Sequence, residues 1–139
     1  MTGIEVLDAS VRATRDWVED LTRRLGWHDR ARACRGLLAV LHALRDCLPR
    51  EEAIYVGAQL PALLRGLYYE GWHPGRRPSS HSRAAFLERI TDGVHRDPAV
   101  DAEQLARTVF ALLAAHMPAA ELEDTKAATP GPLHNLWPS

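Results

Sequence analysis

Two stretches of the chain share one pattern: residues 40–69 read VLHALRDCLPREEAIYVGAQLPALLRGLYY, and residues 109–138 read VFALLAAHMPAAELEDTKAATPGPLHNLWP. Pro49 in the first stretch matches Pro118 in the second, an offset of 69 positions. Outward from these prolines, the same offset pairs Glu19 with Glu88, Val40 with Val109, Leu44 with Leu113, and Pro61 with Pro130. Self-similarity at a fixed offset is the sequence signature of a repeated supersecondary unit.

The repeated pattern predicts two copies of one helical unit that pack together. We expect a single domain over residues 1–139, built from a helical repeat at 4–70, a linker at 71–80 and a second helical repeat at 81–137. The linker reads GWHPGRRPSS and is rich in the Pro, Gly and Ser residues that mark loops. Each copy alone would expose an apolar face. The predicted fold is therefore all-α, with two tandem pseudo-symmetric repeats packed into one helical bundle.

Apolar spacing predicts the individual helices. Over residues 4–25 the apolar side chains recur at three-four spacing, and Gly26 is a suitable C-terminal stop. Asp29 can cap a second helix that runs to Leu48. Proline is disfavoured inside a helix, so Pro61 divides the segment that follows. The remaining predicted helices lie at about 50–59, 61–70, 81–95, 101–116, 118–128 and 131–137.

Composition limits the classes of function. At 139 residues, with 46% hydrophobic and 25% charged residues, the chain has the material for one ordinary core. A net charge of −1 and a pI of about 6.6 argue against a nucleic-acid-binding protein, which needs a basic excess. The N-terminus lacks the features of a signal peptide, and no apolar stretch reaches a membrane-spanning length. We expect a cytoplasmic protein that binds neither nucleic acid nor membrane.

The two cysteines fall within one predicted helix. Cys34 and Cys47 are 13 residues apart, which is about 20 Å along a helix. A disulfide requires Cα atoms within about 7 Å of each other. We therefore expect two reduced thiols.

The tripeptide Gly-Trp-His occurs twice, at residues 26–28 and 71–73, each time directly after a predicted helix. Its spacing of 45 differs from the offset of 69, so the duplication did not create it. One interpretation is a pocket bordered by both tripeptides, because aromatic side chains with a polar edge are enriched at recognition surfaces. The other is structural: glycine ends the helix and tryptophan packs back onto it. The candidate binding residues are Trp27, His28, Tyr68, Tyr69, Trp72, His73, Arg76 and Arg77.

The second tripeptide lies in a corner at residues 69–73 that begins the linker. Its aromatic residues stand beside Arg76 and Arg77, the composition of an apolar anchor with a charged rim. We expect this corner to be ordered, with the ring of Tyr69 or Trp72 accessible to a partner.

Other polar clusters have an ordinary explanation as solvated helix faces. His42 and Asp46 are four residues apart, and Glu88, Asp92 and His95 share another helix face. Neither group has the spacing of a complete metal site. No phosphate-binding loop, nucleophile elbow, paired-cysteine zinc motif or HExxH motif occurs. We therefore expect no enzyme activity, no catalytic residue, no metal and no cofactor.

Three segments carry a family resemblance: LGWHDRARA (25–33), VLHALRDCLPREEAIYVGAQLPALLRGLYYEGWHP (40–74) and EDTKAATPGPLHNLWP (123–138). Together they resemble a bacterial family of small proteins, domain of unknown function 2267. The resemblance implies a small, soluble, all-α protein. It implies no reaction, cofactor or catalytic residue.

Two hypotheses of function remain. The first is a non-enzymatic interaction module that binds a protein partner through a helical groove or the linker corner. The alternative is a small apolar ligand bound between the two repeats, near Trp27, Tyr69 and Trp72. A large exposed apolar patch would favour the partner, and a closed apolar cavity would favour the ligand. The expected state is a monomer or a small homo-oligomer.

Overall fold

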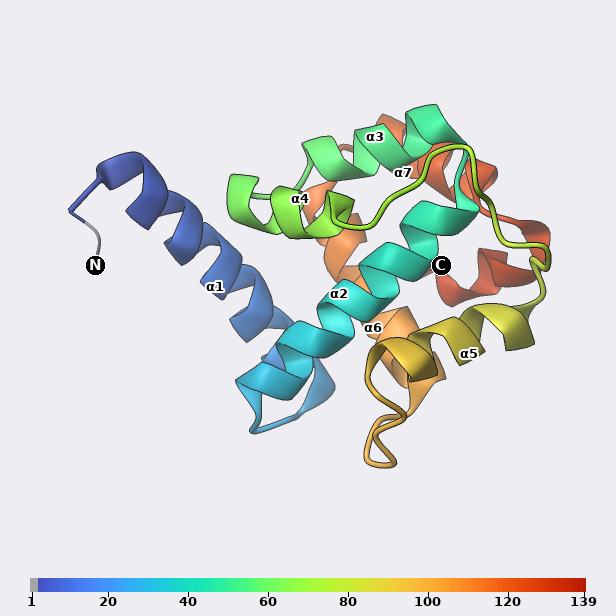
Figure 1. Cartoon of the computed structure of the whole chain (residues 1–139), viewed down its shortest axis with the longest axis horizontal. Coiled ribbons are helices and arrows are strands. Elements are labelled where there is room, and N and C mark those ends of the chain that lie inside the picture. The colour runs from blue at the N-terminus through green and yellow to red at the C-terminus, as the bar shows by residue number, and fades with distance from the viewer. Residues whose placement is uncertain (1–2) are drawn as a thin grey trace.

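The computed structural model describes residues 3–139, and over that range the chain forms helices and no strands, as predicted (Figure 1). The elements in chain order are α1 (Glu5–Leu25), α2 (Arg30–Cys47), α3 (Arg50–Ala58), α4 (Ala62–Tyr69), α5 (Arg83–Gly93), α6 (Ala102–His116), α7 (Ala119–Ala128) and the 3-10 helix η1 (Gly131–Leu136).

Prolines and acidic caps set the helix boundaries. A proline directly precedes each of α3, α4, α7 and η1, with φ between −57° and −52° in all cases. Proline suits a helix start because its ring fixes φ near the helical value. Asp29 accepts a hydrogen bond from the Arg32 N–H at the start of α2, and Asp101 caps α6 in the same way. The predicted break at Pro61 and both predicted aspartate caps are confirmed.

The predicted helix at 81–95 is too long at both ends. Ser82 is the N-cap of α5, where its side chain accepts a hydrogen bond from the Ala85 N–H. At the other end, His95 and Arg96 have positive φ values of 58° and 54°. The Arg96 N–H bonds to the Thr91 carbonyl at 2.8 Å. This left-handed turn stops the helix, although neither residue is glycine.

Helix α2 is the centre of the fold. It packs against α1, α4, α5 and α6, while α3 packs against α7 and η1 against α6 (Figure 1). The apolar faces of α2 and α6 are fully buried in this core, as the apolar spacing of these helices predicts; the residues include Leu41, Leu44, Val109, Phe110 and Leu113. Aromatic rings extend this core, with Phe110 stacked on Trp137 at 4.2 Å between ring centroids.

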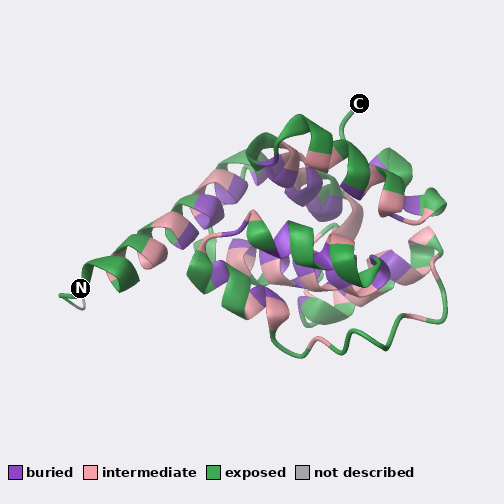
Figure 2. Ribbon diagram, turned by 90° about the horizontal axis from the view of Figure 1, so that it is seen from above, coloured by how far each residue is buried: buried purple, intermediate pink, exposed green. Residues whose placement is uncertain are grey.

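The first half of α1 extends away from the rest of the molecule (Figures 1 and 2). All the buried residues of this helix lie between Thr14 and Leu25. Before Thr14 the helix is exposed or only partly covered. Within residues 3–139, no helix combines the length and apolar character that crossing a membrane requires.

Candidate functional site

The first Gly-Trp-His is a helix cap. Gly26 has a φ of 72°, its N–H bonds to the Arg23 carbonyl at 3.0 Å, and the Trp27 N–H bonds to the Thr22 carbonyl at 3.1 Å. These are the two hydrogen bonds of a Schellman motif. Trp27 packs partly buried against the core. The structural interpretation is therefore correct for this copy.

The second Gly-Trp-His forms a different structure, a type II turn. Glu70 has φ −57° and ψ 132°, Gly71 has φ 74°, and the Trp72 N–H bonds to the Tyr69 carbonyl at 3.1 Å. This turn requires a positive φ at its third residue, which is why glycine stands there. The Tyr69 and Trp72 rings stack at 5.5 Å between centroids, and both are partly exposed.

The two tripeptides do not border one pocket. Trp27 lies before the start of α2, whereas the corner at 69–73 lies beside the C-terminal half of that helix. Arg45 fixes the corner there, because its Nη1 donates to the carbonyls of Tyr68 and Glu70 at 2.6 and 2.8 Å. Arg45 is 16 residues beyond Asp29, about 24 Å along the helix axis.

The remaining candidates of the corner divide between core and surface. Tyr68 is fully buried, its hydroxyl donates to the Ala53 carbonyl at 2.6 Å, and burial raises the pKa of its phenol. It therefore belongs to the core. Arg77 donates to the Cys47 carbonyl at 2.6 Å and ties the linker to the end of α2. Among all the candidate binding residues, those that are exposed are His28, His73, Arg76 and Arg77.

The predicted polar clusters form no site among the described residues. Glu88 and Asp92 both accept hydrogen bonds from exposed Arg96, at 2.6 and 2.5 Å. His42 bonds instead to the Leu67 carbonyl, and Asp46 accepts from Arg45. Across residues 3–139, no group of three or more His, Cys, Asp or Glu is arranged to hold a metal ion.

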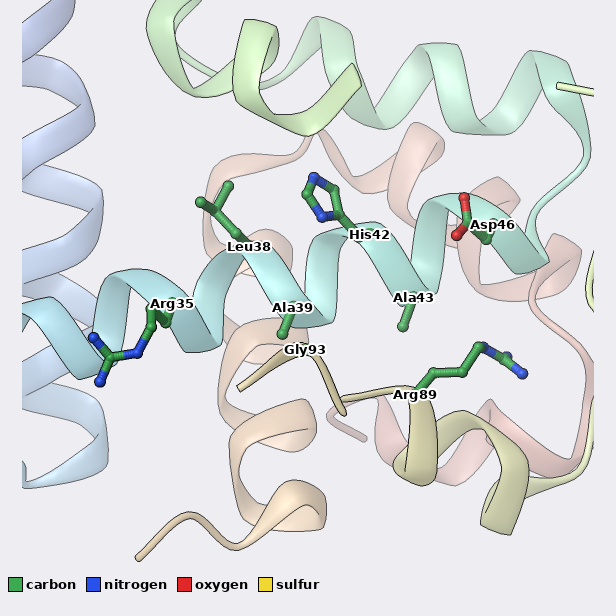
Figure 3. Close-up of a pocket in the computed structure, with 8 residues that line it drawn as sticks. All are labelled: Arg35, Leu38, Ala39, His42, Ala43, Asp46, Arg89 and Gly93. Carbon is green, nitrogen blue, oxygen red and sulfur yellow. The ribbon is translucent and has the colours of Figure 1, made fainter. Parts of the chain in front are cut away.

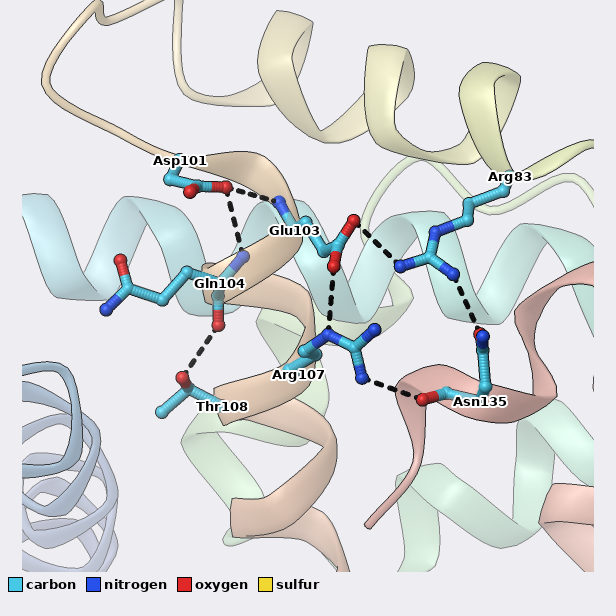
Figure 4. Close-up of polar contacts among 7 residues, drawn as sticks. All are labelled: Arg83, Asp101, Glu103, Gln104, Arg107, Thr108 and Asn135. Atoms are coloured by element: carbon cyan, nitrogen blue, oxygen red, sulfur yellow. Dashed lines mark hydrogen bonds and ion pairs between the residues drawn. The ribbon is translucent and has the colours of Figure 1, made fainter.

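A polar network on the surface of α6 is structural (Figure 4). Glu103 accepts from Arg83 at 2.7 Å and from Arg107 at 3.1 Å, and these bonds hold the pKa of its carboxyl below the usual value. The same two arginines also bond to Asn135. The network joins α5, α6 and η1, and it leaves Glu103 fully occupied.

The strongest candidate for binding is one face of α1. Its apolar residues form a single stripe at three-four spacing from Ile4 to Leu25. In the second half of the helix the stripe is buried, with Leu21 fully covered and Leu25 7% exposed. In the first half the same stripe is open, with Ile4 52% and Leu7 49% exposed.

This open stripe leads into a groove of about 510 Å³ between α1, α2 and α4. The N–H of Leu63 donates to the Ser10 hydroxyl at 2.8 Å and holds α4 against α1. The groove is lined by Val11, Thr14, Arg15, Val18, Arg30, Ala31, Cys34 and Leu63. This lining contains two arginines and no carboxylate. The stripe from Ile4 to Val11 and this lining together are called the α1 groove below.

Residues 14–136 match the family model described as "Uncharacterized conserved protein (DUF2267)". The chain belongs to the DUF2267 family. This confirms the resemblance seen in the sequence, and the match includes the whole linker corner at 69–73. No curated protein matches the chain. In this DUF2267 protein, most of the projecting part of α1 lies before the matched residues.

Sequence reasoning missed the α1 groove in this DUF2267 protein. The three-four stripe of α1 was visible, but its pattern is the same in the buried and the exposed half. Leu63 belongs to another predicted helix and gives no sign of lying beside Val11. The sequence indicated only that Cys34 is a reduced thiol, whereas the structure shows that it is partly buried and lines the groove.

Proposed function

We propose that this protein is a non-enzymatic interaction module that binds an amphipathic helix of a partner protein in the α1 groove. The observation that carries the proposal is the apolar stripe that is buried in one half of α1 and exposed in the other. A helix laid in an apolar groove is a recurring mode of peptide recognition, with anchors at i, i+3, i+4 and i+7. On the groove side, Ile4, Leu7 and Val11 form an apolar row with the same spacing, which can pack against such anchors.

The charge of the groove supports a partner with an acidic flank. Arg15 and Arg30 stand at its rim without a carboxylate in the lining. Arg30 pairs with Glu19 at 2.9 Å, but both side chains are well exposed, at 65% and 39%. Such a surface pair contributes little and can be exchanged. Glutamate or aspartate beside the apolar anchors of the partner would complement this rim.

The test uses two synthetic helical peptides that share one leucine stripe. One carries glutamate at the flanking positions and the other carries lysine. We expect the glutamate peptide to bind about tenfold more tightly or better, because complementary charge favours it. Raising the ionic strength should weaken its binding, since the rim is solvent-exposed. Fluorescence anisotropy measures both dissociation constants.

Two adjacent exposed residues of α1 provide a matched pair of variants. Leu7 lies on the stripe, and Val6, which is 73% exposed, lies on another face. Leu7→Asp should abolish peptide binding, and Val6→Asp should leave it unchanged. Equal effects of the two substitutions, or equal binding of both peptides, would contradict the proposal. A wild-type dimer that Leu7→Asp dissociates in sedimentation would identify a second copy as the occupant and overturn the acidic partner.

The two cysteines supply an independent readout. Cys34 lines the groove, whereas burial raises the pKa of the Cys47 thiol to about 12, so Cys47 should stay inert. We expect one thiol to react with an alkylating reagent, and the bound glutamate peptide to slow that reaction. Reaction at Cys34 that is unaffected by saturating peptide would mean that the peptide binds elsewhere.

The alternative is a small ligand held between the two halves of the chain. A cavity between α2 and α5 supports a ligand at this boundary. Its lining includes Arg35, Arg89 and Asp46, so an apolar ligand fits less well than one that carries a charge.

We also propose that the two halves are pseudo-symmetric repeats. A shift of 69 positions carries α1 onto α5 and α2 onto α6. The contact of α1 with α6 therefore corresponds to the contact of α5 with α2. Gly36 and Leu105 are matched positions, and a Cβ atom on Gly36 would lie 2.9 Å from Leu105 Cδ1. Matched residues touch each other only near a two-fold axis. An experimental structure in which Pro49 and Pro118 occupy unrelated positions after superposition of 4–70 on 81–137 would contradict this.

A further inference from the structure

A cavity of about 270 Å³ lies between α2 and α5 (Figure 3). Ala39 and Ala43 point from α2 toward α5, and Gly93 closes the space near Ala39. The two ends carry charge, with Arg35 toward the start of α2 and Arg89 below the end of that helix. The cavity therefore has an apolar middle and an arginine at each end. Asp46 also lines it near Arg89, but that carboxylate already accepts from Arg45 Nε at 2.8 Å.

Arg89 has one guanidinium edge without a partner. Its Nη1 lies 3.4 Å from the Ser80 carbonyl, while Nε and Nη2 are covered from solvent and bond to no described residue. Nε and Nη2 share the lateral edge of the guanidinium, so their N–H groups point in parallel. His81, next to Ser80 in the chain, also has a covered ring nitrogen, Nδ1, without a partner.

A guanidinium keeps its charge at any ordinary pH, so this edge cannot be neutralised by losing a proton. Buried polar groups in proteins are almost always hydrogen-bonded, and an exception indicates a missing water, ion or ligand. The neighbouring arginine of α2 follows the rule. Arg45 is more deeply buried than Arg89, and its donors reach Asp46, Tyr68 and Glu70.

We propose that the cavity between α2 and α5 binds a small amphiphilic carboxylate, whose two oxygens accept from Nε and Nη2 of Arg89. Two parallel donors match two carboxylate oxygens, which is the bidentate pairing that arginine favours. The short apolar body of the ligand lies over Ala39 and Ala43. The cavity is just below the usual size range of ligand pockets, which selects a small molecule.

The guanidinium turns toward the cavity to meet the ligand. The side chain of Arg89 already lines the cavity, so a rotation of its outer bonds is sufficient. This rotation gives up the Nη1 contact with Ser80, which is long for a hydrogen bond at 3.4 Å. It also moves the guanidinium off the Phe86 ring, whose centroid lies 5.9 Å from Arg89 Cζ. The loss is small because both contacts lie near the outer limit of their distance range.

The test compares hexanoate, hexanol and inorganic phosphate on the ¹⁵N-labelled protein. NMR follows the Arg Nε–H signals directly. We expect hexanoate to shift the Arg89 signal in a saturable manner, and hexanol and phosphate to bind at least about tenfold more weakly. The Arg107 signal is the internal control, because its Nε already bonds to Glu103 at 3.1 Å and neither residue lines this cavity. This comparison needs no variant and is independent of folding effects.

Variants then show whether hexanoate requires the two parallel donors of the guanidinium or only a positive charge. Arg89→Lys keeps the charge but removes the parallel donors, so hexanoate affinity should fall about tenfold. Arg35→Lys at the far end should change it by less than about threefold. Three results would overturn the proposal: no saturable shift with hexanoate, equal binding of hexanol, or phosphate binding as tightly as hexanoate. The last would make the site a free-anion site.

Discussion

Tyr68 illustrates what a buried polar side chain requires in this fold. The ring is fully buried, and its hydroxyl reaches the Ala53 carbonyl at 2.6 Å. The neighbouring Tyr69 is partly exposed, and its hydroxyl lies 3.4 Å from the Ile54 carbonyl. Adjacent tyrosines of the same candidate site thus have different roles, because one faces the core and the other faces the linker turn.

We expect Tyr68→Phe to lower the free energy of unfolding by about 1 kcal/mol, the typical net contribution of a buried hydrogen bond. Tyr69→Phe should change it by less than about 0.5 kcal/mol, because its bond is long and partly exposed. Urea denaturation followed by circular dichroism measures both. Equal losses in the two variants would contradict the assignment of Tyr68 to the core.

At the scale of helices, glycine marks a close approach of two elements. A Cβ atom on Gly93 of α5 would lie 2.7 Å from the Ala39 Cβ and 3.3 Å from its Cα. Neither atom can move without moving α2. Gly66 of α4 instead has open space where a Cβ would stand. Substituting each of these two glycines by alanine therefore distinguishes the effect of packing from the effect of helix propensity.

Gly66→Ala should stabilise the protein by about 0.5–1 kcal/mol, because alanine loses less backbone entropy in a helix. Gly93→Ala should destabilise it by about 1–3 kcal/mol, because overpacking pushes α5 away from α2. Differential scanning calorimetry gives both shifts. A more stable Gly93→Ala protein would mean that the α2–α5 contact is looser than described.

The loop between α5 and α6 depends on an ionised carboxylate. Asp97 accepts from the Ala99 N–H and from Arg32 of α2, and these bonds lower the pKa of its carboxyl below the usual 3.8. A lowered pKa stabilises the fold above the unfolded value, and this contribution is lost as the pH falls through the folded value. Asp97→Asn removes this carboxyl. When the pH is lowered from neutral to below 3.8, the free energy of unfolding should therefore fall less in the variant than in the wild-type protein. Unfolding curves of equal pH dependence in both proteins would refute this.

Considered as a whole molecule, the protein has one core to which both halves contribute. Leu44 of α2 and Leu113 of α6 are matched positions, and both are fully buried. Phe86 of α5 contacts Phe110 of α6, and Trp17 of α1 stacks on His116 at the end of α6. Because helices of each half cover those of the other, we expect the chain to unfold in a single transition.

Leu44→Ala should cost about 2–5 kcal/mol, and Leu113→Ala should fall in the same range, since both remove buried methyl groups from the shared core. Leu63→Ala is the matched control at a 43% exposed position and should cost less than about 1 kcal/mol. Chemical denaturation measures all three. Loss of one half with the other still folded would contradict a shared core.

Local information was sufficient for the helices and their ends. Apolar spacing identified α1 and α2, Pro61 marked a break, and Asp29 and Asp101 marked caps, because these effects act within one turn of the chain. The left-handed turn at His95 and Arg96 was missed, since neither residue is glycine. The apolar stripe of α1 at three-four spacing was also visible in the sequence.

The placement of the candidate sites depended on contacts between distant residues. Sequence reasoning grouped Trp27 with Trp72, but the chain sets them at different positions along α2. It listed Tyr68 among the candidate binding residues, although the packing of α3 and α4 buries it. Leu7 is exposed because the first half of α1 extends beyond the helices that cover its second half. Arg89 has an unpaired edge because no acceptor in residues 3–139 lies within hydrogen-bond reach of its Nε and Nη2. Burial and hydrogen-bond pairing are properties of three-dimensional neighbours, which periodicity along the chain does not specify.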